Sequence, residues 1–138
     1  MFNQTVEYAL RAAVMLARHL DQPQTGRQIS EQTQVPSPYL TKVLAQLVKA
    51  NLVSSSRGAG GGYVLAQSPS DIRVLDVVNA IEPIQRILSC PLKNPGQCDK
   101  ICPLHCELDQ AIAGVEQALA NRTLADLIKN NKASLNRR

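Results

Sequence analysis

Every cysteine of this 138-residue chain lies in one short segment, CPLKNPGQCDKICPLHC. The thiols are Cys90, Cys98, Cys102 and Cys106, and His105, one of the two histidines, lies beside the last of them. Three interpretations compete: a disulfide network, a metal or iron–sulfur site, and an incidental group of thiols. Zinc sites usually pair cysteines about two to four residues apart in two separate groups, whereas iron–sulfur clusters accept looser spacings such as this one. The pattern therefore favours a metal or iron–sulfur site.

The composition indicates where such a site would operate. The chain has no Trp, one Phe and three Tyr, so its core must be built from Leu, Ile, Val and Ala, which favours packed helices. No apolar run approaches the roughly 20 residues that span a bilayer, and the first residues lack the basic leader of a signal peptide. We therefore expect a cytoplasmic protein. In a reducing compartment, clustered cysteines bind metals or take part in redox chemistry more often than they form structural disulfides.

The charge distribution points towards a polyanionic partner. The net charge is +4, and the basic excess lies in the first 66 residues. Such an excess is compatible with nucleic-acid binding, although many surfaces carry it for solubility. No pair of carboxylates, no nucleophile beside a base and no phosphate-binding loop is visible, so the sequence does not predict an enzyme.

Three helices are expected in the first part of the chain. The first runs from Thr5, as its N-cap, to about Leu20, with apolar residues at helical spacing. A short helix follows over residues 26–33, and a third opens with Ser37 as its N-cap and a proline at its first helical position. Asn51 is suited to the left-handed conformation that ends a helix. The short second helix, tight turn and capped third helix are typical of a helix-turn-helix.

The stretch LVSSSRGAGGGYVLA predicts a β-hairpin after these helices. A tight turn needs one or two glycines, and this one has more, beside a single cation, Arg57. Such a tip can approach phosphates or a minor groove, which makes the hairpin the wing of a winged helix. The alternative for the glycine-rich turn is a plain hairpin that does not contact DNA. The alternative for the polar side of the third helix is an ordinary solvated surface. The candidate DNA-binding residues are Arg27, Ser37, Tyr39, Thr41, Lys42, Arg57, Gly58, Gly60 and Gly61.

The C-terminal part predicts a means of dimerisation. A helix is expected over about Val74–Glu82, and a long one from Pro103 to about Asn121, followed by a short helix capped by Thr123. The long helix carries apolar residues spaced like a coiled-coil seam: Leu104, Leu108, Ile112, Val115 and Leu119. A second subunit would cover this seam, and a two-fold dimer matches a palindromic operator in double-stranded DNA.

The expected fold class is therefore mainly α with a small β hairpin. A winged helix-turn-helix DNA-binding domain occupies residues 1–82, and a cysteine-rich cluster-binding loop occupies 83–102. The dimerisation helix, a short helix and a basic tail make up 103–138.

The chain resembles the IscR- and NsrR-type iron–sulfur winged-helix transcription regulators over nearly its whole length. The resemblance is carried by EYALRAAVMLA, YLTKVLAQLVKANLV, SSRGAGGGYVLA, LDVVNAIE, the cysteine segment and LHCELDQAI…TLADL. It implies a homodimer that binds promoter palindromes. It also implies a [2Fe–2S] or [4Fe–4S] cluster held by three loop cysteines and a variable fourth ligand.

Carried over to this sequence, the resemblance makes Cys90, Cys98 and Cys102 the three loop cysteines. The fourth ligand is His105, as in the histidine-ligated members, Glu7 of the partner subunit, or Cys106, an extra thiol that the usual pattern lacks. Cys98 and Cys102 are closer together than in the best-known members, so either cluster type stays open.

The function that follows is sequence-specific transcription regulation, most simply repression, with DNA binding controlled by an iron–sulfur cluster. A cluster-free winged-helix regulator that responds to thiol oxidation or a small metabolite is the alternative. A small redox protein is a third hypothesis, which the glycine-rich hairpin disfavours because an electron carrier needs no DNA wing.

Overall fold

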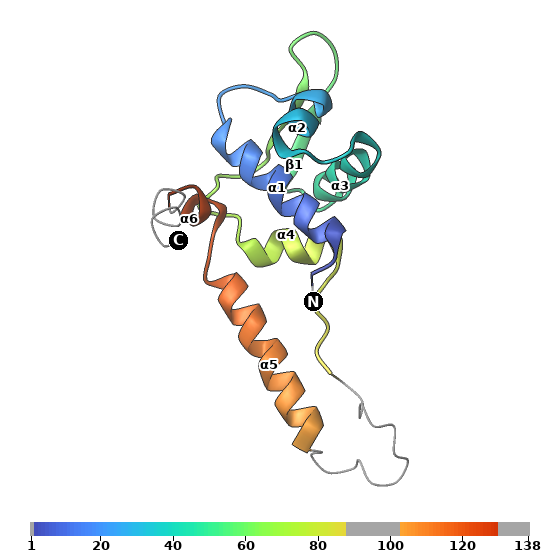
Figure 1. Ribbon diagram of the computed structural model, residues 1–138. Coiled ribbons are helices and arrows are strands. Elements are labelled where there is room, and N and C mark those ends of the chain that lie inside the picture. Colours follow the sequence, from blue (N-terminus) through green and yellow to red (C-terminus); the bar gives the residue numbers. More distant parts are fainter. Residues whose placement is uncertain (1, 88–102, 130–138) are drawn as a thin grey trace, which may run out of the picture.

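The computed structural model describes residues 2–87 and 103–129 of the chain. The elements in this part are α1 (Gln4–Arg18), α2 (Gly26–Thr33), α3 (Ser37–Lys49), β1 (Val53–Ser56), β2 (Gly62–Leu65), α4 (Val74–Ile81), α5 (Pro103–Ala120) and α6 (Leu124–Lys129). The first four helices, the hairpin and α6 form one body, from which α5 projects (Figure 1). This arrangement confirms the predicted fold class.

The core of the body consists of helix faces with small and aliphatic side chains. In α1, Ala9, Ala12 and Leu16 are completely buried, and the small alanines let the neighbouring helices approach closely. Ile29 is the buried residue of α2, as its isolated position in a polar helix predicts, and Leu44 is buried in α3. Burial of a Leu or Ile side chain stabilises a fold by about 1.5–3 kcal/mol, so these contacts fix the helix-turn-helix on α1.

Helix α1 begins earlier than predicted. Its N-cap is Asn3, whose Oδ1 accepts a hydrogen bond from the backbone N–H of Val6 at 3.0 Å, so Thr5 lies inside the first turn. The side chain of Asn3 also donates to Glu82, at the end of α4. This second contact favours Asn3 over Thr5 as the cap. The helix ends at Arg18 rather than at about residue 20.

Helix α3 begins at Ser37 itself, so the prediction that Ser37 is the N-cap was wrong. The N-cap is Pro36, and no side chain makes a capping hydrogen bond there. Pro38, expected at the first helical position, is therefore the second residue of the helix, where its fixed φ still suits the first turn. At the other end, Asn51 has a φ of 61°, which confirms the predicted left-handed stop.

The hairpin is attached to the helix-turn-helix. Strands β1 and β2 pair in antiparallel fashion, with Val53 opposite Leu65 and Ser56 opposite Gly62. Tyr63 also forms an isolated antiparallel bridge with Gln24, in the connection between α1 and α2. The turn end of β2 is therefore held by main-chain hydrogen bonds on two sides, to β1 and to Gln24, and only the turn beyond Gly62 extends away from the body.

After α5 the chain returns to the body through α6. The backbone N–H of Leu124 donates to the carbonyl of Ile72 at 2.9 Å, and the side chain of Leu124 is completely buried in the main core. The hydroxyl of Thr123 accepts from the backbone N–H of Asp126 at 3.2 Å, so Thr123 caps this helix as predicted. The end of α5 nearest α6 is thereby tied to the winged helix.

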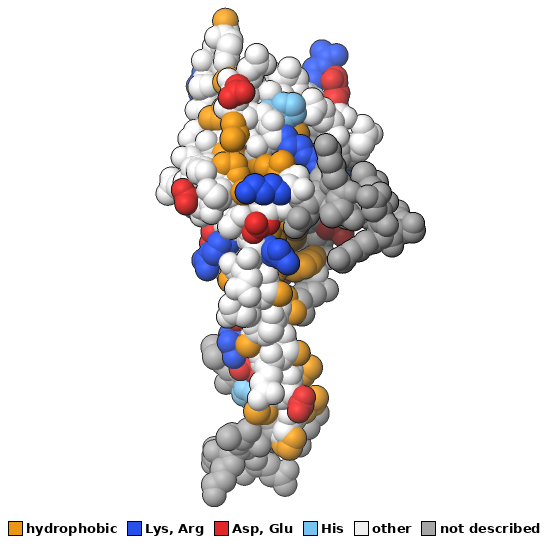
Figure 2. Space-filling view, turned by 90° about the vertical axis from the view of Figure 1, so that its left-hand side faces the viewer, with side chains coloured by type: hydrophobic (Ala, Val, Ile, Leu, Met, Phe, Trp, Pro, Cys, Tyr) orange, Lys and Arg blue, Asp and Glu red, His pale blue; other side chains and the backbone are white. Residues whose placement is uncertain are grey.

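Helix α5 buries none of its residues completely within its own chain. Leu104 and Leu108, near its free end, are 41% and 40% exposed, and hydrophobic side chains follow one side of the long helix in Figure 2. Leu119, near the other end, packs against a small cluster of Val6, Val74 and Val78. Within residues 2–87 and 103–129, no helix is long and apolar enough to cross a membrane.

Candidate nucleic-acid interface and cluster-binding segment

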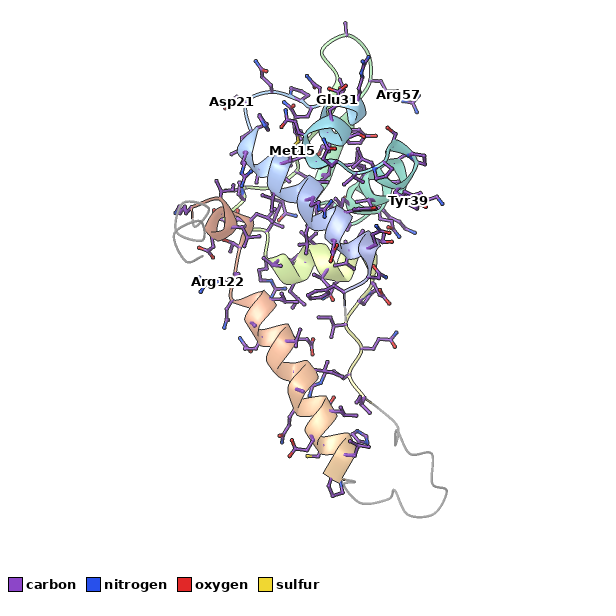
Figure 3. The ribbon with its side chains drawn as sticks, viewed as in Figure 1. Met15, Asp21, Glu31, Tyr39, Arg57 and Arg122 are labelled. Atoms are coloured by element: carbon purple, nitrogen blue, oxygen red, sulfur yellow. The ribbon has the colours of Figure 1, made fainter. Side chains whose placement is uncertain are left out.

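The predicted DNA-contacting residues of α3 are exposed. Ser37, Tyr39, Thr41 and Lys42 all lie outside the buried stripe of the helix. In the view of Figure 3, Tyr39 and Arg57 lie on the right of the molecule, whereas Arg122 lies at its lower left. Tyr39 of α3 and Arg57 at the start of the wing therefore lie on the same side of the molecule in this view.

The side chains at the start of α3 are partly committed to local contacts. The hydroxyl of Thr41 donates to the carbonyl of Ser37 at 3.0 Å, which leaves its oxygen free to accept. The ring of Tyr39 lies 6.0 Å from that of Tyr8 in a tilted arrangement, and Tyr39 is still 54% exposed. A large aromatic side chain held by a neighbour and open to solvent can contact bases or sugars with little loss of rotamer entropy.

The N-terminus of α2 opens onto the same face; the sequence prediction included Arg27 of this turn but not Gly26 or the cleft beside it. A cleft of about 210 Å³ there is lined by Gly26, Arg27, Leu40, Leu44, Tyr63 and the two hydroxyl residues of α3, Ser37 and Thr41. Backbone N–H groups at a helix N-terminus attract phosphate oxygens. The capping box of Thr25 and Gln28, with bonds of 3.1 and 2.9 Å, was the available signal for this helix start.

Arg27, at the N-terminus of α2, forms an exposed ion pair with Glu31. Its Nε lies 3.0 Å from Oε1 of Glu31 one turn later, but the two side chains are 88% and 65% exposed. An exposed pair of this kind contributes little and is easily exchanged for another partner. Arg27 therefore stays available to an anion at the cleft.

At the wing tip, Arg57, Gly58 and Gly60 are exposed and Gly61 is half-buried. Gly58 and Gly60 have positive φ values of 95° and 77°. The backbone conformation of the turn therefore explains why these two positions are glycine. A Cβ on Gly61 would lie 2.5 Å from the carbonyl oxygen of Ser56. The tip thus combines one cation with exposed glycines, Gly58 and Gly60.

The candidate cluster ligands are only partly within the described residues. Cys90, Cys98 and Cys102 lie outside them. His105 and Cys106 lie in the first turn of α5 and are half-buried, while Glu7 is exposed on α1. In the part of the chain that the structure describes, no three Cys, His, Asp or Glu side chains come together in a way that could hold a metal.

The imidazole of His105 is held in one orientation. Its Nε2 lies 2.7 Å from the carbonyl oxygen of Ile87. Because a carbonyl only accepts, Nε2 donates this hydrogen bond, and in the neutral ring Nδ1 carries the lone pair. Histidine ligands of metals usually donate their other N–H to a carbonyl or carboxylate in this way. The chain's own residues therefore fit a cluster that takes a histidine ligand.

A pair that no local pattern indicates lies next to His105. Asp109 accepts from Nε and Nη2 of Arg86 at 2.7 and 2.6 Å, and from the backbone N–H of Ile87 at 3.1 Å. Nη1 of Arg86 also lies 3.5 Å from Glu116. Arg86 lowers the pKa of Asp109 to about 2. The two residues are far apart in the sequence, and therefore periodicity and spacing could not reveal them.

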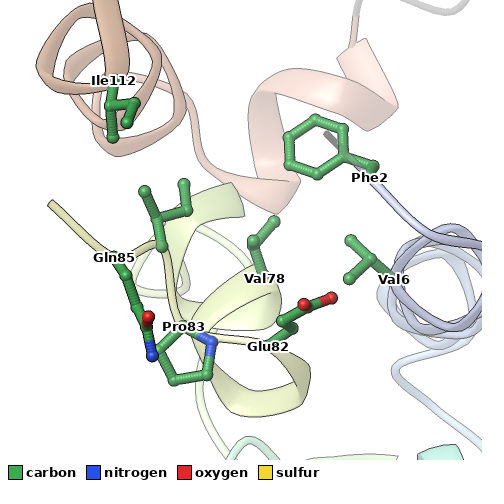
Figure 4. A pocket seen from close by; sticks show the side chains of 8 residues that line it. Phe2, Val6, Val78, Glu82, Pro83, Gln85 and Ile112 are labelled. Atoms are coloured by element: carbon green, nitrogen blue, oxygen red, sulfur yellow. The ribbon is translucent and has the colours of Figure 1, made fainter. Parts of the chain in front are cut away.

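The apolar side of α5 faces a second cleft, of about 330 Å³ (Figure 4). It is lined by Phe2, Val6, Val78, Glu82, Pro83, Ile84, Gln85 and Ile112. Ile112 belongs to the predicted seam, and Phe2 is 40% exposed. The middle of the seam therefore borders an apolar cleft of its own chain, while its free end remains uncovered by the described residues.

The helix-turn-helix, the wing and the exposed face that they share define a winged-helix DNA-binding protein. The chain belongs to the Rrf2 family, described as iron-dependent transcriptional regulators, whose model matches residues 2–130. It is 31% identical over 129 residues to the HTH-type transcriptional regulator NsrR of Bacillus subtilis (strain 168), an alignment that covers 91% of this chain and 88% of NsrR.

Two solved structures show the same fold. The structure of T. potens IscR has a TM-score of 0.79 and 30% sequence identity, and the match covers 94% of this chain and 87% of that chain. The structure of CymR (YrzC), the global cysteine regulator of B. subtilis, has a TM-score of 0.82 and 26% identity, with 95% and 98% covered. These relatives are regulators, so the protein is a transcription regulator and not an enzyme, as its sequence predicts.

Proposed function

We propose that this protein is a repressor whose DNA binding is controlled by an iron–sulfur cluster. Cys90, Cys98 and Cys102 hold the cluster together with a fourth ligand. The observation that carries this proposal is the orientation of His105 at the start of α5. Its Nε2 is hydrogen-bonded to a carbonyl, which leaves Nδ1 as the ring nitrogen that can bind iron. The family description and the likeness to NsrR and IscR support it. When bound, the cluster supplies a group that oxidants or nitric oxide can alter.

DNA binding in this proposal uses both exposed elements. Helix α3 enters the major groove, where Tyr39, Thr41 and Lys42 contact base edges and phosphates, and Arg57 at the wing reaches the backbone or the minor groove. The N-terminus of α2, with Gly26 and Arg27, receives a phosphate. The support is that these residues, apart from the half-buried Gly26, are exposed, and that main-chain hydrogen bonds join the wing to the connection between α1 and α2.

We also propose that the regulator is a homodimer that binds a palindromic operator. Regulators of this family bind DNA and are typically dimeric. In this chain, Leu104 and Leu108 are about two-fifths exposed on the outer turns of α5, and Ile112 borders an apolar cleft. Pairing this face with a second copy removes the apolar surface from water, and the two-fold axis then places two recognition helices on successive half-sites.

One observation favours a second candidate, a cluster-free regulator that responds to thiol oxidation or a small metabolite. The fold is also similar to CymR, described as the global cysteine regulator. Cys106 is a half-buried free thiol in the first turn of α5, 3.7 Å from the side-chain amide of Gln110. In this alternative, oxidation at this turn changes how α5 packs.

Anaerobic reconstitution of the whole 138-residue chain tests the proposal. Iron and sulfide assays and the visible spectrum report whether a cluster forms, and its absorption shape distinguishes the two cluster types. Binding of promoter DNA is then compared for the reconstituted and the cluster-free protein. A chain that takes up no iron and sulfide, and whose DNA binding responds to a thiol oxidant, would support the second candidate.

A further inference from the structure

The segment that leads from α4 to the cysteines is bound to α5 through five residues, which we call the Asp109 cluster. Its members are Arg86, Ile87, His105, Asp109 and Glu116. All of the hydrogen bonds between the 83–87 segment and α5 that the described residues show belong to this cluster. It lies immediately before residues 88–102, which contain the three loop cysteines.

The Asp109 cluster binds both backbone polar groups of one residue, Ile87. His105 donates to the carbonyl oxygen of Ile87, and Asp109, one turn further along the same helix face, accepts from its N–H. Asp109 in turn receives two nearly parallel bonds from the guanidinium of Arg86. A bidentate, charge-assisted contact is stronger and more directional than a single ion pair. Ile87 is therefore fixed by groups on α5, and the ring of His105 is fixed by Ile87.

We propose that Asp109 and Arg86 are positioning residues that fix the backbone of Ile87 through its N–H, and thereby keep His105 in the Nε2–H form with Nδ1 available to the iron–sulfur cluster. The part of this inference that concerns the cluster rests on the proposed function. The positioning itself does not, because the hydrogen bonds belong to the chain alone. Outer contacts of this kind keep a ligand oriented and can change metal retention by about tenfold to a hundredfold when they are removed.

Asp109→Ala in the whole 138-residue chain tests the inference, with Glu107→Ala as the matched control. Both residues are acidic and lie on α5, but Glu107 is exposed and makes no hydrogen bond or ion pair among the described residues. Three quantities are measured: hydrogen exchange of the Ile87 amide and the ring ¹⁵N shifts of His105, both without cluster, and the rate at which a chelator removes the cluster after reconstitution.

We expect Asp109→Ala to speed exchange of the Ile87 amide by about tenfold or more, to mix the two ring forms of His105, and to speed cluster loss by about tenfold. Glu107→Ala should match the unsubstituted protein in all three. Equal amide exchange in the two variants would overturn the positioning role. Altered exchange with an unchanged rate of cluster loss would overturn its link to the cluster. If the unsubstituted protein binds no iron–sulfur cluster, the proposed function is refuted. The positioning role of Asp109 is then decided by the amide exchange of Ile87 and the ring shifts of His105, which need no iron–sulfur cluster.

Discussion

Gly62 of the wing lies directly against Gln24 of the connection between α1 and α2. Tyr63, the next residue, and Gln24 exchange two backbone hydrogen bonds of 3.0 and 2.8 Å. A Cβ on Gly62 would lie 2.6 Å from the carbonyl oxygen of Gln24, and its φ of 147° is one that side chains rarely adopt. Glycine at this position therefore lets the wing pack on the helix-turn-helix.

We predict that Gly62→Ala separates the wing from the helix-turn-helix. The clash and the strained φ should lower the free energy of unfolding by about 1–3 kcal/mol, and weaken binding of promoter DNA. Thermal or denaturant unfolding and an affinity measurement check this. Gly114→Ala is the control, since α5 leaves open space around Gly114, and alanine there should stabilise the helix by about 0.5–1 kcal/mol. Equal stability of the two variants would contradict the packing argument.

We predict that Lys42 and Arg57 each contact the DNA backbone or a groove edge. Replacing both by Ala should weaken promoter binding and lower the slope of log K against log salt by about one for each phosphate that the protein no longer neutralises. Arg122→Ala is the control, because Arg122 lies on another side of the molecule (Figure 3). An unchanged affinity and salt slope in the double variant would show that this face does not bind DNA.

The elements with local signals could be predicted from the sequence. The helices, their apolar stripes, the left-handed Asn51 and the hairpin each depend on neighbours within about one or two turns, and the structure confirms them. The start of α1 could not be predicted, since Asn3 and Thr5 are both good caps. The contact of Asn3 with Glu82, which spacing does not show, distinguishes them.

Contacts between distant segments were likewise invisible to sequence patterns. Nothing in the order of residues indicates that Leu124 bonds to Ile72, or that Arg86 pairs with Asp109. The two pairs arise because α5 runs beside the 83–87 segment and α6 packs on the body. The apolar spacing of α5 did indicate an extended seam, but not that Leu119 would pack on its own chain while Leu104 stays exposed.

We predict that Leu108→Asp disrupts a dimer without unfolding the single chain. Leu108 is 40% exposed, so the charge stays hydrated in a monomer, whereas in a seam it would be buried without a partner at a cost of several kcal/mol. Sedimentation velocity at micromolar concentration measures the change. Gln110→Asp, which places the same charge on a different side of α5, should leave the dimer intact. If the unsubstituted protein is a monomer at this concentration, the apolar side of α5 is not a dimer interface.

The low pKa of Asp109 predicts that the Asp109 cluster persists in acid. Hydrogen bonds from Arg86 lower this pKa from the ordinary value of 3.8 to about 2. Because the folded-state pKa is depressed, the contribution of Asp109 is fully present above about pH 4 and is lost as the pH falls through about 2. An NMR titration of its carboxyl carbon checks the value. In Arg86→Gln the midpoint should rise towards 3.8; a midpoint that stays near 2 would show that Arg86 is not the cause.

The last prediction concerns the ligands of the cluster. We expect single Ser variants at Cys90, Cys98 and Cys102 each to abolish cluster uptake, measured as iron and sulfide per chain after anaerobic reconstitution. Adjacent residues on a helix point about 100° apart, so His105 and Cys106 are not expected to face the same cluster.

Because His105 has Nδ1 available, His105→Ala should change the visible spectrum and speed cluster loss. Cys106→Ser, and Glu7→Gln in the first turn of α1, should leave both unchanged. His19→Ala, at the other histidine, controls for loss of an imidazole, since His19 lies at the end of α1. A spectrum that responds to Glu7→Gln and not to His105→Ala would instead assign the fourth position to Glu7 of the partner subunit. A cluster retained after loss of Cys98 or Cys102 would refute the assignment of the loop cysteines.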